Sequence, residues 1–155
     1  MAKKSRFNLL LLAAAVVFAG YLIFAGYHSS VHKAQPSISA QEAGNSDAIL
    51  AKAFANRMSN LQVSGQGVVF RILPDDNEGT RHQRFIVRLG SGQTLLIAHN
   101  IDIAPKIGDL REGNDVAFFG EYEWNDKGGV IHYTHVDPKG VHAAGWVEYQ
   151  GKKYQ

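Results

Sequence analysis

The sequence contains no cysteine among its 155 residues, which excludes disulfide bonds, a thiolate nucleophile and a zinc site built on thiolates. It also lacks an excess of positive charge outside its N-terminus. Without Lys3, Lys4 and Arg6, 13 basic side chains stand against 14 acidic ones, so the formal net charge of +2 becomes −1. Binding of nucleic acid over a broad surface requires a positive excess. Any contact with nucleic acid must therefore be made at a local site.

One long hydrophobic run stands near the N-terminus. Leu9–Tyr27 contains no charged residue and approaches the roughly 20 residues that cross a bilayer as a helix. The basic residues before it place the N-terminus in the cytoplasm. We therefore expect residues 1–27 to anchor the protein in the bacterial inner membrane, with the remainder in the periplasm or outside the cell. The alternative is a signal peptide cleaved after Val17-Phe18-Ala19, which would release a secreted domain.

The rest of the chain predicts a tether followed by one small domain. Residues 28–45 are small and polar and predict a linker. Ser46-Asp47 predicts the start of a helix over about 48–59. The glycine-rich remainder predicts strands over 66–73, 82–89, 93–99, 115–123 and 130–135, and a terminal hairpin over 146–155.

The order of these strands indicates the fold. A meander of three strands, an irregular connection over 100–114 and two further strands match an OB-type barrel. We therefore expect a mainly β protein in which residues 46–155 form a five-stranded OB-type antiparallel barrel, preceded by the short helix and the transmembrane helix. An antiparallel β-sandwich is the alternative.

The pairing of the first three strands predicts a row of basic side chains. A two-residue turn at Ser91-Gly92 places Arg84 opposite His99, and Arg71 then faces Arg84. Facing guanidinium groups repel each other unless an anion or a carboxylate lies between them, and their geometry suits phosphate. The row predicts either an anion clamp or a ladder of salt bridges. The same register places six residues in the core: Val68, Phe70, Phe85, Val87, Leu96 and Ala98.

Imidazole, carboxylate and amide side chains gather in the C-terminal third of the chain, within 99–102 and 120–138. His132 and His135 lie on opposite faces of a regular strand, so they converge only if the strand ends or bends near Thr134. With His99 and the neighbouring carboxylates they predict a site for a divalent metal ion. A hydrogen-bonded polar rim of the barrel is the alternative.

Three stretches of this region resemble the signature of a known family of small bacterial proteins, catalogued as a domain of unknown function. They are His99-Asn-Ile-Asp102, Gly120-Glu-Tyr-Glu-Trp-Asn125 and Gly128-Gly-Val-Ile-His-Tyr-Thr-His-Val-Asp-Pro138. The resemblance covers roughly residues 62–155. The chain departs from the family pattern at Tyr133, where Trp is common, and at Val136, where a further His is common. The resemblance implies an exported single-domain protein and supplies no activity.

These residues support two functions of different classes. The first is a metal-dependent phosphodiesterase, a nuclease that acts outside the cytoplasm. The second is a non-catalytic OB-type module that binds an oligonucleotide, a glycan or an envelope protein. In the first, the divalent ion is Mg²⁺, Mn²⁺, Ca²⁺ or Zn²⁺. The expected roles are catalysis by His99, His132, His135 and Arg84, phosphate binding by Arg71 and Arg84, and metal binding by Asp102, Asn125 and Asp137.

Overall fold

The computed structural model describes residues 40–155. The expected anchor over 1–27 and most of the expected linker lie outside the described residues. Within the described part of the chain, no helix has the length and apolar character that a membrane span requires.

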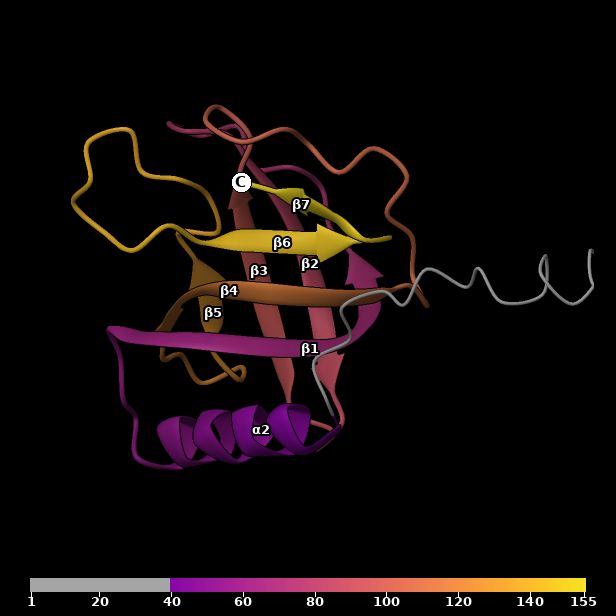
Figure 1. Cartoon of the computed structure of the whole chain (residues 1–155), viewed down its shortest axis with the longest axis vertical. Helices are drawn as coiled ribbons and strands as arrows, with labels where there is room; N and C mark the ends of the chain where they lie inside the picture. Colours follow the sequence, from indigo (N-terminus) through magenta and orange to yellow (C-terminus); the bar gives the residue numbers. More distant parts are fainter. Residues whose placement is uncertain (1–39) are drawn as a thin grey trace, which may run out of the picture. The chain divides into compact units, whose positions relative to one another are not determined.

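Five strands close into a barrel by their pairing, and Figure 1 shows how they are arranged. The pairing runs from β1 to β2, β3, β5 and β4, and β4 returns to pair with β1. A further hairpin of β6 and β7 extends the sheet from β4. This order confirms the expected OB-type barrel. The strands are β1 (Leu61–Ile72), β2 (His82–Leu89), β3 (Thr94–Asn100), β4 (Asp115–Glu123), β5 (Val130–His132), β6 (Trp146–Tyr149) and β7 (Lys152–Tyr154).

The barrel is not antiparallel throughout, because β3 and β5 are parallel. All other neighbours in the barrel are antiparallel. Strand direction alternates around an antiparallel barrel, and alternation cannot close on an odd number of strands. Five strands in a closed ring therefore require at least one parallel pair, and the long connection over 101–114 supplies it by carrying the chain from β3 to β4.

Among the described residues one helix, α2 (Ala40–Ala55), precedes the barrel, and it lies alongside β1 in Figure 1. It begins eight residues earlier than expected and takes up the end of the expected linker. Asp47 does not cap the helix. Its carboxylate instead accepts a hydrogen bond from the backbone N–H of Ser91 at 2.7 Å, which ties α2 to the turn between β2 and β3. The carboxylate that was expected to cap the helix therefore makes a tertiary contact instead.

The expected registers of the first three strands are wrong, by one residue between β2 and β3 and by up to two residues between β1 and β2. The loop between β2 and β3 has three residues, Gly90–Gly92, because Leu89 pairs with Gln93 through a backbone hydrogen bond of 2.9 Å. Arg84 consequently lies opposite Ala98, and Gln83 lies opposite His99. An irregularity in β1 after Val69 shifts the other pairing, so that Arg71 faces Ile86. The expected row of Arg71, Arg84 and His99 is therefore absent.

The core follows from this register. β2 presents Phe85 and Val87 to the interior as expected, but β1 and β3 present the faces opposite to those expected. Val68 and Phe70 are exposed, whereas His99 is fully buried. The core of the barrel contains Val63, Val69, Phe85, Val87, Leu95, Ile97, Val116, Phe118, Tyr122, Ile131 and Val147, with Leu50 and Ala53 of α2 packed into the same cluster.

Candidate functional site

The turn between β4 and β5 determines which residues of the two strands face each other. The Oδ1 atom of Asn125 accepts hydrogen bonds from two backbone N–H groups of the turn, at 2.9 and 3.0 Å. The turn ends in two glycines with φ angles of 114° and 105°. The register that follows places Glu121 directly opposite His132.

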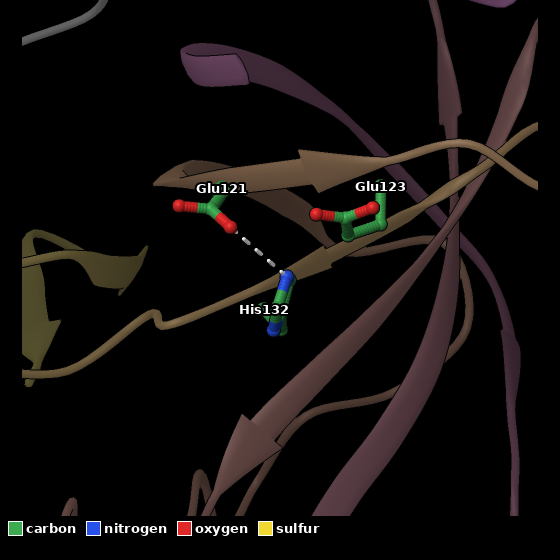
Figure 2. Close-up of side chains that lie close together, drawn as sticks. All are labelled: Glu121, Glu123 and His132. Carbon is green, nitrogen blue, oxygen red and sulfur yellow. Dashed lines mark ion pairs between the residues drawn. The ribbon is translucent and has the colours of Figure 1, made fainter. Parts of the chain in front are cut away.

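Glu121, Glu123 and His132 form a compact group of potential ligand atoms (Figure 2). One ligand atom from each residue lies within 4.8 Å of the others. The two glutamates are two positions apart on β4, so their side chains leave the same face of the barrel, and His132 reaches them from the end of β5. All three side chains are half-buried. Within residues 40–155, this is the one group of three His, Asp or Glu residues close enough to share a metal ion.

Burial leaves the imidazole of His132 neutral at pH 7. It lowers the pKa of His132 from 6.5, although the carboxylates of Glu121 and Glu123 act in the opposite direction. The Nε2 atom lies 3.7 Å from Oε1 of Glu121, which is too long for a hydrogen bond. This nitrogen is buried and has no hydrogen-bond partner among the described residues. A neutral imidazole beside two carboxylates is a suitable donor set for a divalent ion.

The chain leaves the strand directly after His132. Tyr133 has a φ angle of 52°, a left-handed conformation that ends β5. Its ring stacks between the imidazoles of His132 and His142, with centroid distances of 4.2 and 4.1 Å. His135 meets the same ring edge-on at 6.3 Å. The bend that was expected near Thr134 is thus present one residue earlier, and it brings His132 and His135 to one tyrosine ring.

Asp137 organises the loop that follows. Its carboxylate accepts hydrogen bonds from the backbone N–H groups of Lys139, Val141 and His142. These bonds, chiefly that from Lys139, lower the pKa of Asp137. They also place Nε2 of His142 at 4.0 Å from Oδ2 of Asp137. The aspartate therefore holds His142 on the ring of Tyr133.

The other expected metal ligands also lie in turns. Asp102 accepts hydrogen bonds from the backbone N–H and from Nε of Arg81, at 2.8 and 2.7 Å, and both bonds lower the pKa of Asp102. Asn125 closes the turn between β4 and β5. The structure thus distributes Asp102, Asn125 and Asp137 over three separate turns and does not bring them together as a group of ligands with the histidines.

The two arginines expected to bind phosphate lie on β1 and β2. Arg84 donates a hydrogen bond from Nε to the carbonyl oxygen of Pro74 at 3.1 Å, and its NH1 lies 3.6 Å from Oδ2 of Asp76. Arg71 is exposed near the end of β1. Arg84 therefore contributes to the connection between β1 and β2.

His99 has a role in the barrel interior. Its Nε2 atom lies 3.2 Å from the carbonyl oxygen of Pro105, which can only accept, so this nitrogen carries the proton. Its Nδ1 atom, 2.9 Å from the hydroxyl of Thr134, then accepts a hydrogen bond. Burial lowers the pKa of His99, against the effect of the contact with Pro105. Both ring nitrogens are engaged, and the neutral imidazole ties the end of β3 to the bend after β5.

The buried state of His99 predicts a loss of stability in acid. An unfolded histidine is protonated below a pKa of about 6.5, whereas the folded state resists protonation because the pKa of His99 is lowered. The contribution of His99 to the free energy of unfolding is therefore fully present above about pH 6.5. It falls as the pH drops below that value, by up to about 1.4 kcal/mol per pH unit. Urea unfolding between about pH 5 and 8 measures this slope. His99→Gln should reduce it, and an unchanged slope would contradict the assignment.

The expected metal site included the carboxylates near the histidines, but metal binding was assigned to Asp102, Asn125 and Asp137 and not to the two glutamates of β4. Counting outward from the turn at Asn125 would have paired Glu121 with His132, because the expected strands end at 123 and begin at 130, as the observed strands do. His142 was missed for a different reason. Its position depends on the conformation of the loop over 133–145, and no local pattern in the sequence determines that conformation.

Comparison with known proteins identifies one family. A family model with the description "Protein of unknown function (DUF3465)" matches residues 34–155. The match includes α2, the whole barrel and the three clustered side chains of β4 and β5. It confirms the resemblance to a domain family of unknown function. No curated protein matches the chain.

Proposed function

The chain belongs to the family described as "Protein of unknown function (DUF3465)", and we propose that it is a divalent-metal-dependent phosphodiesterase. The observation that carries this proposal is the convergence of Glu121, Glu123 and His132 within 4.8 Å. Three protein ligands leave coordination positions free, as catalytic sites require and closed structural sites do not. A metal ion in such a site lowers the pKa of a bound water and polarises a phosphoryl oxygen.

The donor set narrows the choice of metal. Mg²⁺ and Ca²⁺ favour ligands that are all oxygen. Imidazole favours Zn²⁺, and carboxylates suit Mn²⁺ as well. We therefore favour Zn²⁺ or Mn²⁺ among the four ions that the sequence suggested. His132 supplies the nitrogen, Glu121 and Glu123 supply the oxygens, and the lowered pKa of His132 keeps its lone pair available at neutral pH.

Hydrolysis of a phosphodiester consumes one water. A new P–O bond forms to the water oxygen, the P–O bond to the departing alcohol breaks, and a proton passes from the water to that alcohol. His135 and His142 are candidates for this transfer, since both contact the ring of Tyr133 that stacks on His132. Their rings lie edge-to-face at a centroid distance of 5.1 Å.

The proposal includes export of the domain. Its support is the uncharged run Leu9–Tyr27 behind three basic residues, together with the absence of cysteine from the chain. In this arrangement the barrel acts on phosphodiesters in the periplasm or outside the cell, either tethered to the inner membrane or released after cleavage.

The experiment uses the full-length protein with plasmid and single-stranded DNA, in Zn²⁺, Mn²⁺, Mg²⁺, Ca²⁺ or chelator. We expect cleavage with Zn²⁺ or Mn²⁺, none with chelator, and a loss of at least about 100-fold in His132→Ala. Far-UV circular dichroism must show that the variant is folded. Intact DNA under every condition would rule out the nuclease, and DNA retained without cleavage would favour the second candidate.

That second candidate is a non-catalytic binding module, and one surface favours it. Val68, Phe70 and Ile72 of β1 are 42, 41 and 38% exposed. The guanidinium of Arg88 lies 3.8 Å from the centre of the Phe70 ring. An aromatic ring beside an arginine on the outside of an OB-type barrel can stack a base of a single strand. This surface, formed by Val68, Phe70, Ile72 and Arg88, lies on β1 and β2. The group of Glu121, Glu123 and His132 lies on β4 and β5.

A further inference from the structure

The glutamate and histidine of the candidate metal site belong to a row that crosses three strands. Glu121 of β4 pairs with His132 of β5 on one side and with Gln62 of β1 on the other. Residues that face each other in antiparallel strands direct their side chains to the same side of the sheet, about 5 Å apart at Cβ. Gln62 therefore stands beside Glu121 on the face that carries the three ligand atoms.

Two buried nitrogen atoms flank Glu121 in this row. They are Nε2 of Gln62 and Nε2 of His132, and neither has a hydrogen-bond partner among residues 40–155. Buried polar atoms without partners are rare because desolvating them is costly. The imidazole nitrogen is accounted for as a metal ligand. An amide nitrogen carries two protons and no available lone pair, so it cannot bind the metal ion itself.

We infer that Gln62 is an anion-binding residue of this site, whose amide N–H donates to an oxygen of a ligand held by the metal ion. This inference rests on the proposed metal site and makes it more specific. A donor beside the ion favours a ligand with two oxygens that share a negative charge, one bound to the metal and one to the amide. The non-bridging oxygens of a phosphodiester have this geometry, and a neutral ligand does not use both contacts.

The chain offers matched variants. Gln62→Leu removes the amide and keeps a similar volume. Gln62→Glu keeps the shape and replaces the donor with a carboxylate. Gln66→Leu is the control, because Gln66 lies on the same strand and the same face, four residues further along, opposite Ala117 rather than Glu121. All three variants are made in the full-length protein.

The probes are Co²⁺, whose visible spectrum reports its ligands, and dimethyl phosphate as a small phosphodiester. Titration of the protein with Co²⁺ gives the affinity for the metal. Titration of the Co²⁺-loaded protein with dimethyl phosphate gives the affinity for the anion. We expect Gln62→Leu to lower the affinity for dimethyl phosphate about tenfold, the loss expected for one hydrogen bond to a charged group. The affinity for Co²⁺ should not change. Gln66→Leu should match the wild type in both.

Gln62→Glu tests whether residue 62 reaches the ion. Its carboxylate should tighten Co²⁺ binding as an additional oxygen ligand and abolish binding of dimethyl phosphate. A merely structural glutamine would not produce opposite changes in the two affinities.

The possible failures are distinguishable. If the wild type does not bind Co²⁺, the metal site and this inference both fall. If it binds Co²⁺ and dimethyl phosphate does not change the spectrum, or if Gln62→Leu leaves the affinity for dimethyl phosphate unchanged, the metal site stands and the role of Gln62 is overturned. A parallel loss of both affinities in Gln62→Leu also overturns it, because Gln62 would then act on Glu121 and not on the anion.

Discussion

Replacing Glu121 by Gln is expected to weaken the binding of Zn²⁺ by at least about 100-fold. Loss of a residue that only hydrogen-bonds to a metal ligand already lowers the metal affinity about 10- to 100-fold. Glu121 is itself a proposed ligand, and it faces His132 directly. The substitution removes one negative charge and one strong oxygen donor with little change in shape. Isothermal titration calorimetry of the full-length protein measures the effect.

Glu78→Gln is the matched control for this experiment. It makes the same change of charge in the exposed connection between β1 and β2. We expect it to retain the affinity of the wild type for Zn²⁺. Equal affinities in the wild type and in Glu121→Gln would show that the ion, if bound, is held elsewhere.

Replacing Gly129 by Ala is expected to cost at least about 3 kcal/mol of unfolding free energy. Gly129 has a φ angle of 105°, which side chains other than hydrogen rarely tolerate. A Cβ atom at this position would also lie 2.1 Å from Cε2 of Tyr122. That ring cannot yield, because Tyr122 is fully buried and its hydroxyl donates to the carbonyl oxygen of Gly128 at 3.2 Å. Urea unfolding of the full-length protein measures the cost.

Gly79→Ala separates the two causes. Gly79 also has a positive φ angle, of 71°, but a Cβ atom there would meet no atom within 4 Å. Its substitution should cost about 1 kcal/mol, from the backbone conformation alone. The difference between the two variants contains the contact with Tyr122 together with the cost of the larger φ angle at Gly129. Equal costs would show that the turn relaxes around the added methyl group.

The strands were predictable because their signals are local. Alternation of apolar and polar residues predicted β2 and β4 with the observed bounds, and it placed Val116, Phe118 and Tyr122 on one face of β4, where they are buried. The glycine-rich turns and the irregular stretch before β4 gave the strand order of an OB-type barrel. Each of these inferences depends on neighbours within a few residues.

The register was not predictable to the same degree. A loop of two residues or of three residues is compatible with Gly90-Ser91-Gly92, and the choice reverses the face of β3 on which His99 lies. The prediction that the apolar face of β2 is buried did not depend on the length of this loop, and it is confirmed. The arginine row depended on the loop length and on a regular β1, and both assumptions were wrong.

The sequence by itself determined that this protein has one mainly β domain behind a hydrophobic N-terminal run, and that imidazole and carboxylate groups gather near its C-terminal end. Only the tertiary structure decided which of these groups meet. His99, which was expected in both the arginine row and the metal site, points into the core and has both nitrogens engaged. The glutamates of β4 and the glutamine of β1 join His132 instead, because closing the barrel places β1 and β5 on either side of β4, and pairing across strands is a property of the closed sheet.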